Sequence, residues 1–337
     1  MTKDNIKKLI PQVIKVLAFV LVFFVILQTL SVTVFSPERT SKISKKRADS
    51  YSYVTEAENT IDVVCLGSSD MWSGFVPTHL WEKYGFTSVV SSFSHQSVAQ
   101  AQMMLEGITK TQKPKIAILD IDTLYDGRGV DEPIAPGQNR MKHLFSMAEP
   151  EAFENRITDT FQIFTTHNIW KDYGKKIKRR PYAHGYLYNK TVVKNEDKPY
   201  MIETDERDIP IETRANELRS FAHYCKNNDI QVLFVEMPSF YSWNYARYNA
   251  VQDLADELDV EFLDLNFMYD EIGISITNCY RDGGSHLNYA AACKVTEYLG
   301  AYVRDNYDIE SRRDDSQIAE YWDEEVIKFK KHNKIKD

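Results

Sequence analysis

The chain has 337 residues, of which 43% are apolar and 12% aromatic, enough for one large domain or two small ones with a sizeable core. Residues 1–50 hold nine basic against three acidic residues, and the remainder holds 32 against 46. An acidic main domain excludes nucleic acid as the expected partner, because binding phosphates requires a basic face. The sequence also contains no P-loop, dinucleotide fingerprint or zinc motif, so we expect no cofactor and no metal.

The amino terminus predicts a membrane anchor. After a short tail, residues 1–15, the run Val16–Phe35 has no charged residue and is mostly Val, Leu, Phe and Ile. A helix of this length rises about 30 Å, enough to cross the hydrocarbon layer of a bilayer. A cleaved signal peptide is the alternative, although no small-x-small cleavage site follows the run. Basic residues lie on both sides of the run, so the positive-inside rule leaves the orientation open.

Residues 36–58 are predicted to be a basic linker. The stretch Arg39–Arg47 carries five Lys or Arg residues. Next to an anchor it could lie on anionic lipid or on teichoic phosphate. A solvated linker is the equal alternative.

Residues 59–308 alternate short apolar runs with amphipathic helical patterns. This alternation is typical of a parallel sheet with helices on both faces, so we expect an α/β three-layer sandwich with about five parallel strands. The predicted strands are Ile61–Leu66, Ser88–Ser92, Ile116–Asp120, Val232–Glu236 and Glu261–Leu265, and the helices are Thr78–Tyr84, Val98–Thr109, Glu212–Asn228, Asn244–Leu258 and Asn288–Asp305.

Two further segments complete the predicted domain organisation. Residues 124–210 break the rhythm of strands and helices and are predicted to be a helical insertion between the third and fourth strands. Residues 309–337 are predicted to form a C-terminal amphipathic helix over Ser316–Lys331. Packing against the domain is the default role of such a helix, and membrane contact is the alternative. Its apolar side consists of Ile318, Tyr321, Trp322, Val326 and Phe329.

A serine-bearing turn follows the first predicted strand. Ser68 and Ser69 come directly after Gly67, at the carboxyl edge of the sheet, where ligands bind in open α/β folds. A serine needs an adjacent base that is oriented by a third group. Asp282 and His286, near the other end of the chain, supply the candidates. We predict Ser69 as nucleophile, His286 as base and Asp282 as the orienting carboxylate; a turn with an N-cap serine is the structural alternative.

These segments resemble the SGNH/GDSL hydrolase superfamily, and within it the membrane-anchored cell-envelope branch of teichoic-acid D-alanylation (DltD-like) proteins. The resemblance covers residues 61–303 and implies a flavodoxin-like fold, with Ser69 as nucleophile and His286 as base. The stretches that carry it are LGSSDMWSGFVP (66–77), KPKIAILDID (113–122), VLFVEMPS (232–239), FLDLN (262–266) and DGGSHLNYAAACKVTEYLG (282–300).

The spacing of the predicted acid and base departs from the family pattern. The family places Asp three residues before His, whereas Asp282 lies four residues before His286. Gly283 and Gly284 could absorb the extra residue as a bulge.

The oxyanion donors also depart from that pattern. The family glycine of the second block has no counterpart within residues 92–97, where His95 and Gln96 stand, and the family asparagine after the third strand is replaced by Asp120-Ile121-Asp122. Gln96 is the predicted substitute donor, with Ser68 and His95 as further candidates; a structural role for Gln96 is the alternative. Loss of one donor typically lowers the rate by ~10²–10³.

The resemblance implies a membrane-anchored esterase or O-acyltransferase with its domain outside the cytoplasm. The expected substrate is an acetyl or D-alanyl ester of a cell-envelope polysaccharide or teichoic polymer, and the expected partner is a membrane-bound O-acyltransferase. A catalytically inactive scaffold or glycan-binding subunit is the alternative. The aromatic stretch Phe240–Tyr248, just past the fourth strand, could stack on sugar rings or simply pack against the insertion.

Overall fold

The protein is described from a computed structural model. The structure describes residues 3–35, 49–125, 157, 160, 161, 163–167, 180, 182–196 and 199–335. The chain divides into two compact units: Met1–Lys42 with Asp131–Ile177, and Ile43–Val130 with Lys178–Asp337.

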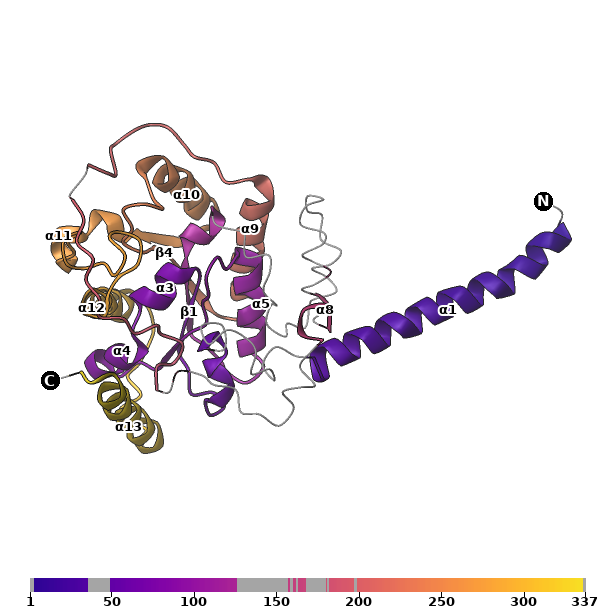
Figure 1. The fold of residues 1–337 in the computed structure, drawn as a ribbon, viewed down its shortest axis with the longest axis horizontal. Coiled ribbons are helices and arrows are strands. Elements are labelled where there is room, and N and C mark those ends of the chain that lie inside the picture. The colour runs from indigo at the N-terminus through magenta and orange to yellow at the C-terminus, as the bar shows by residue number, and fades with distance from the viewer. Residues whose placement is uncertain are drawn as a thin grey trace. The chain divides into compact units, whose positions relative to one another are not determined.

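The larger unit is built on a parallel sheet of five strands in the order β2-β1-β3-β4-β5. Strands β1 and β4 of this sheet are labelled in Figure 1. All its strand pairs are parallel, and this is the flavodoxin-like strand order, so the predicted fold class is confirmed. The strands are largely buried on both faces, which explains their continuous apolar sequences. Their bounds are β1 Val63–Leu66, β2 Ser88–Val90, β3 Ile116–Asp120, β4 Gln231–Glu236 and β5 Glu261–Asp264.

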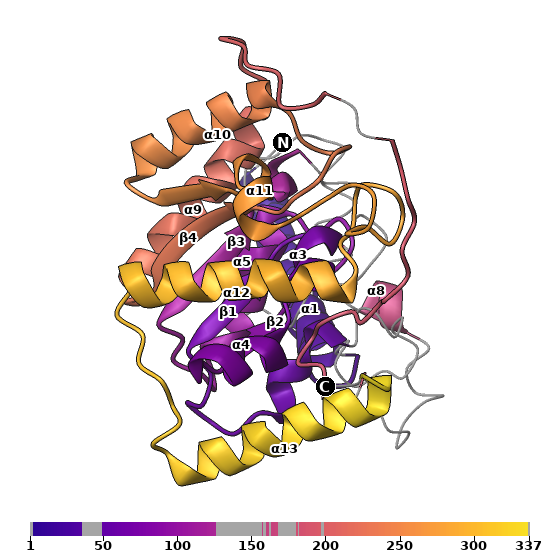
Figure 2. The same cartoon turned by 90° about the vertical axis from the view of Figure 1, so that its left-hand side faces the viewer.

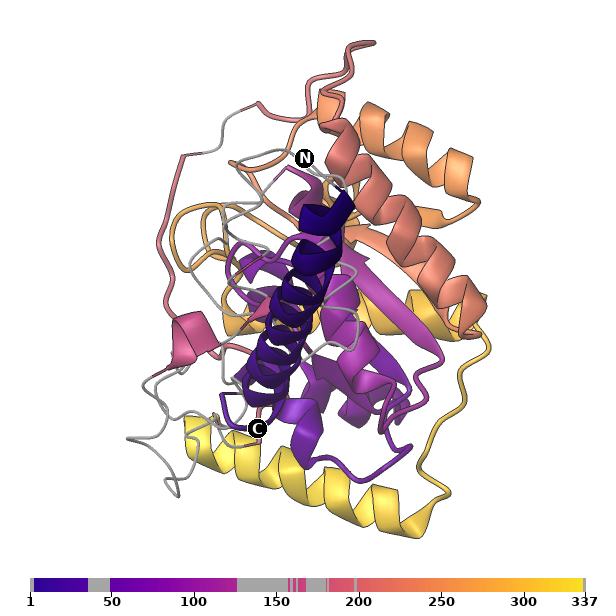
Figure 3. The same ribbon diagram turned by 90° about the vertical axis from the view of Figure 1, so that its right-hand side faces the viewer.

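Helices cover both faces of this sheet. Helices α5 (Val98–Ile108) and α9 (Glu212–Asn227) lie on one face and α4 (Pro77–Tyr84) and α12 (Tyr289–Asn306) on the other, as opposite views show (Figures 2 and 3). Helix α10 (Tyr245–Leu258) packs beside α9 and β5. The crossover from β1 to β2 therefore runs over one face through α4, and the crossovers through α5 and α9 run over the other face, as in a doubly wound fold whose strand order reverses at β1.

The predicted C-terminal helix is present as α13 (Ser316–Asn333) and packs against α4. Ile318, Trp322, Val326 and Phe329 are buried, whereas Tyr321 is 40% exposed. The rings of Trp81 and Trp322 stack with centroids 5.8 Å apart. The apolar side of this helix thus contributes to the domain.

Two predicted boundaries are wrong. The predicted linker 36–58 extends too far, because Tyr51 and Tyr53 are buried in the domain around a short 3₁₀ helix, η2 (Ser52–Thr55). In the predicted helical insertion, residues 182–185 form turns and residues 186–196 are neither helix nor strand. Most of residues 124–181 lie outside the described residues.

The segment 182–196 is held by backbone hydrogen bonds to loops and strand ends rather than by a ladder. Val90 N donates to His184 O at 2.8 Å, Leu187 N to Trp72 O at 2.8 Å, and Val193 N to Tyr280 O at 2.9 Å. Bonds of this kind leave no periodic signature in a sequence, so sequence periodicity does not reveal this segment.

The smaller unit contains helix α1 (Lys3–Thr33) and the short helix α8 (Ile163–Thr166). Residues Ile10–Ser31 of α1 are long and apolar enough to cross a membrane, by length and composition alone. Toward its end Ser31 is fully buried, Ile163 N donates to its Oγ at 3.4 Å, and the ring centroids of Phe24 and Phe161 lie 5.7 Å apart.

Gly67 is required where β1 leaves the sheet. Its φ is 137°, and a Cβ built there would lie 2.4 Å from the Cβ of Asp120. We predict that Gly67→Ala lowers the free energy of unfolding by at least ~1–3 kcal/mol, because overpacking adds to backbone strain. Urea denaturation measures the loss. Gly107→Ala in α5, where no positive φ is involved, is the control and should change stability less; equal losses would contradict the prediction.

Candidate active site

The turn after β1 distinguishes its two serines. Ser68 is the N-cap of helix α3 (Ser69–Gly74): its Oγ accepts from Asp70 N at 3.2 Å and donates to Asp120 Oδ2 at 2.9 Å. Ser68 is 1% exposed, whereas Ser69, the first residue of α3, is only half-buried. Ser68 therefore holds the turn, and the geometry leaves Ser69 with an available hydroxyl.

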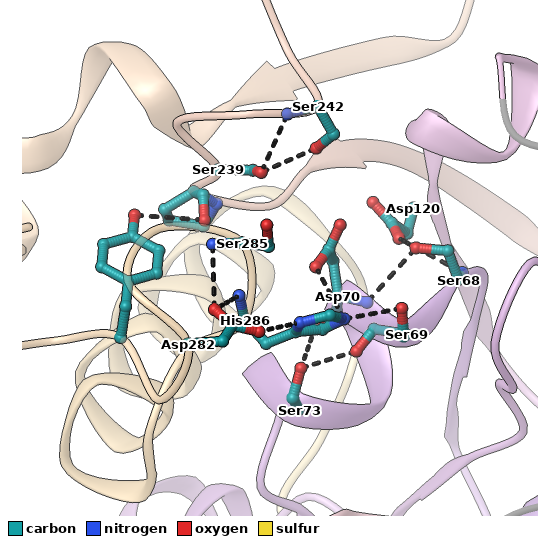
Figure 4. Close-up of polar contacts among 12 residues, drawn as sticks. Ser68, Ser69, Asp70, Ser73, Asp120, Ser239, Ser242, Asp282, Ser285 and His286 are labelled. Carbon is teal, nitrogen blue, oxygen red and sulfur yellow. Dashed lines mark hydrogen bonds and ion pairs between the residues drawn. The ribbon is translucent and has the colours of Figure 1, made fainter. Parts of the chain in front are cut away.

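The three predicted catalytic side chains meet at one point (Figure 4). His286 Nε2 lies 2.7 Å from Ser69 Oγ, and His286 Nδ1 is hydrogen-bonded to Asp282 Oδ2. Residues 217 positions apart in the chain are thus brought into a Ser–His–Asp relay. In such a relay His Nδ1–H donates to the carboxylate, and Nε2 is left free to accept the serine proton.

The four-residue spacing between Asp282 and His286 is accommodated by a local turn. Gly283 and Gly284 have φ of 85° and 147°, the region that favours glycine. Asp282 Oδ1 accepts from the backbone N–H groups of Ser285 at 3.1 Å and His286 at 2.9 Å. The carboxylate thus folds the loop with one oxygen and contacts the imidazole with the other.

Two carboxylates flank the imidazole. Partial burial opposes ionisation of Asp282, but hydrogen bonds from His286 and from the backbone outweigh it and hold the pKa of Asp282 well below its usual value. Asp70 Oδ1 lies 3.7 Å from His286 Nε2 on the other side of the ring, and Asp70 is only 7% exposed. Both charges favour the imidazolium that forms when the base takes a proton.

The prediction that Gln96 donates to an oxyanion is corrected by its contacts. The side chain is fully buried; its Oε1 accepts from Gly67 N at 2.8 Å, and its Nε2 donates to Ser91 O at 3.0 Å. Gln96 therefore ties the turn of Gly67 to the loop after β2. Ser68, a further predicted donor, is occupied by Asp120.

The remaining donor candidates are backbone groups. His95 is exposed and has φ of 57°, a left-handed conformation that usually favours glycine, at the place where the family glycine is missing. In the described part of the chain the N–H of Ser69 makes no hydrogen bond, as expected for the first N–H of a helix. Such N–H groups can bind a developing oxyanion.

Asp120 and Asp122, which stand in place of the family asparagine, have structural partners. Asp120 Oδ2 accepts from both the N–H and the hydroxyl of Ser68, and Asp122 Oδ1 lies 3.7 Å from an Arg247 nitrogen. Among the described residues no group of three His, Cys, Asp or Glu side chains could hold a metal ion.

The burial of Asp120 predicts a pH-dependent stability. Desolvation raises the pKa of Asp120 from 3.8 to about 6, although its hydrogen bonds with Ser68 oppose the shift. Since the folded state holds this proton more tightly than the unfolded state, the contribution to stability is complete below about pH 4 and is lost as the pH rises through about 6. Asp120→Asn should flatten the profile by about 3 kcal/mol. Urea denaturation between about pH 4 and pH 7 tests this; parallel profiles would contradict it.

Sequence reasoning missed two residues beside the predicted triad. Asp70 carries no signal beyond its place next to Ser69. Asn195 lies in the segment 182–196 and donates from Nδ2 to the carbonyl oxygen of Gly283 at 2.7 Å, within the turn that carries His286. Only the folded chain brings Asn195 to this turn, so no sequence motif could have identified it.

No protein-family model and no curated protein matches the chain. Among solved structures, a lipolytic protein of the G-D-S-L family from Desulfitobacterium hafniense is 11% identical, with 72% of this chain and 99% of that chain covered and a TM-score of 0.40. A catalytic mutant of the acetylxylan esterase Axe2 from Geobacillus stearothermophilus is 12% identical, with 74% and 95% covered and a TM-score of 0.36. A GDSL-like lipase from Bacteroides thetaiotaomicron is 12% identical, with 77% and 97% covered and a TM-score of 0.35. Similarity at this level supports no statement about the activity of this chain.

Proposed function

We propose that the protein is a membrane-anchored serine esterase or O-acyltransferase acting on acetyl or D-alanyl esters of a cell-envelope glycan or teichoic polymer. The observation that carries the proposal is the hydrogen-bonded relay from Ser69 through His286 to Asp282. Such a relay activates a hydroxyl that is otherwise a weak nucleophile. The steps of the proposed reaction follow from the order of these three side chains.

In the first half of the reaction, Ser69 Oγ attacks the ester carbonyl while His286 Nε2 takes the hydroxyl proton. The tetrahedral oxyanion collapses, the bond to the leaving alcohol breaks, and His286 returns the proton to that alcohol. In the second half, water or a polymer hydroxyl gives its proton to His286 and attacks the acyl-serine. The bond between the acyl carbon and Ser69 Oγ then breaks, and His286 returns the proton to Ser69 Oγ. Hydrolysis and transfer differ only in this second nucleophile.

The location and the partner are also parts of this proposal. The apolar span of α1 supports a single-pass anchor in the cell membrane. The sequence resemblance implies that the domain lies outside the cytoplasm. The sequence resemblance implies a membrane-bound O-acyltransferase as partner. Protease treatment of intact protoplasts tests the orientation, because an external domain is cleaved and a cytoplasmic one is protected.

The central experiment is covalent labelling of the full chain in detergent with a fluorophosphonate. We expect stoichiometric labelling that peptide mass spectrometry maps to Ser69, together with turnover of p-nitrophenyl acetate. A protein that is neither labelled nor active, yet folded by circular dichroism, would be the inactive scaffold instead. A label on another serine would overturn the assignment of the nucleophile.

A further inference from the structure

The aromatic stretch Phe240–Tyr248 contains one ring that packing does not account for. Phe240 stacks on Tyr269 with centroids 5.1 Å apart, and Trp243 is buried and donates from Nε1 to Asp264 at 2.7 Å. Tyr248 packs against Phe267 at 4.8 Å. Tyr241, in contrast, is 62% exposed.

Although exposed, Tyr241 is fastened to the turn that carries His286. A Cβ built on Gly284 would lie 2.6 Å from Tyr241 Cε2, so only a glycine lets the ring lie this close. Asn195 Nδ2 bonds both the Tyr241 hydroxyl and the carbonyl oxygen of Gly283. The N–H of Phe240, the preceding residue, donates to Gly284 O at 2.8 Å.

A fixed and exposed aromatic ring is suited to bind a sugar. An immobilised side chain loses little conformational entropy on binding, so more of the contact energy appears as affinity. The face of a pyranose ring offers apolar C–H groups over an area that matches a tyrosine ring. Gly284 is two residues from His286, so a sugar bound on Tyr241 would contact the turn that carries the base.

The negative charge of the domain favours one of the two proposed substrates, a neutral envelope glycan, over the other, a teichoic polymer. Residues 51–337 carry 46 acidic against 32 basic side chains, and Asp70 and Asp282 flank the imidazole itself. A poly(glycerol phosphate) has no ring to stack and brings a negative charge with each repeat. A neutral glycan has rings that can stack on Tyr241 and carries no charge that the acidic domain would repel.

We propose that Tyr241 is a binding platform for a pyranose ring of the polymer substrate, adjacent to the reacting ester. Asn195 fixes the platform and the turn of His286 in one arrangement. The inference rests on the proposed function and narrows its substrate to a neutral envelope glycan.

Binding to the full-length Ser69→Ala protein in detergent, measured by calorimetry with chitohexaose as the probe, tests the platform. We expect binding that the added Tyr241→Ala substitution weakens by ~5- to 10-fold, whereas Tyr241→Phe, which keeps the ring, weakens it by about twofold or less. Tyr321→Ala, at an exposed tyrosine on α13, is the matched control and should leave affinity within about twofold. Equal affinity with and without the Tyr241 ring, no chitohexaose binding, or tighter binding of poly(glycerol phosphate) would each overturn the inference.

A kinetic ratio gives a second readout. In protein that retains Ser69, we compare kcat/KM for an O-acetylated oligosaccharide with kcat/KM for p-nitrophenyl acetate. Tyr241→Ala should lower the ratio of the first to the second by about fivefold or more. An unchanged ratio contradicts the platform. Failure of the proposed function is distinguishable: wild-type protein would then turn over neither ester and take up no fluorophosphonate, while chitohexaose binding would still report on Tyr241.

Discussion

Replacing Ser69 by alanine is expected to lower kcat for p-nitrophenyl acetate by ~10⁴–10⁶-fold, because the substitution removes the attacking oxygen and leaves only binding and the oxyanion donors. Steady-state kinetics on the purified full-length chain measure the loss. The residual rate is expected to exceed the rate in water, since the N–H groups at the start of α3 remain in place.

Ser73→Ala is the matched control for this experiment. Ser73 lies on the same short helix and is fully buried, and its hydroxyl donates to the Ser69 carbonyl at 2.6 Å rather than toward the imidazole. Its loss should change kcat by about tenfold or less while costing ~1 kcal/mol of stability. Comparable losses of kcat in the two variants would mean that Ser69 acts through the structure of the helix and not as nucleophile.

Asp282→Asn is expected to lower kcat by ~10³–10⁴-fold. An asparagine is the same size as the aspartate and can still accept the two backbone N–H bonds of the turn, so the fold should persist. It no longer presents a charged acceptor to His286 Nδ1, so the tautomer with the acceptor at Nε2 is no longer favoured. Because its contacts hold the pKa of Asp282 below the usual range, the wild-type carboxylate stays ionised into more acidic solution than an ordinary aspartate.

The Asp70→Asn substitution distinguishes the roles of Asp70 and Asp282, the two carboxylates beside the His286 imidazole. Asp70 lies at 3.7 Å from Nε2, beyond hydrogen-bond distance, whereas Asp282 bonds Nδ1 directly. We therefore expect a loss of kcat for Asp70→Asn that is at least tenfold smaller than the loss for Asp282→Asn. The reverse order would make Asp70 the orienting carboxylate and leave Asp282 as the residue that folds the turn.

The sheet and its helices could be predicted because each strand is a short apolar run bounded by a turn, and each major helix has one apolar side. The fourth strand, expected at Val232–Glu236, begins one residue earlier, and the last sheet helix, expected at Asn288–Asp305, differs by one residue at each end. The predicted triad lies together for the same reason, since parallel strands present their following turns at one edge.

What could not be predicted depends on contacts between loops. The spacing of Ser68 and Ser69 barely separates them, whereas in the folded chain Ser68 caps α3 and donates to Asp120, and Ser69 contacts His286. Gln96 could be expected as an oxyanion donor because nothing in the sequence shows that Gly67 and Ser91 occupy both ends of its amide. The segment 182–196 has no periodicity because its backbone partners lie in separate parts of the chain.

That segment also bears on how the protein could vary among relatives. It joins the helix of the nucleophile to the loop of the base through main-chain groups, Leu187 N to Trp72 O and Val193 N to Tyr280 O. Main-chain bonds form with almost any residue, so an exposed position such as Val193 can drift in evolution while the connection is inherited intact. Proline is the exception, because it removes the donor. We expect relatives to carry many different residues at the position of Val193 but never proline. A conservation score does not reveal a restriction of this kind.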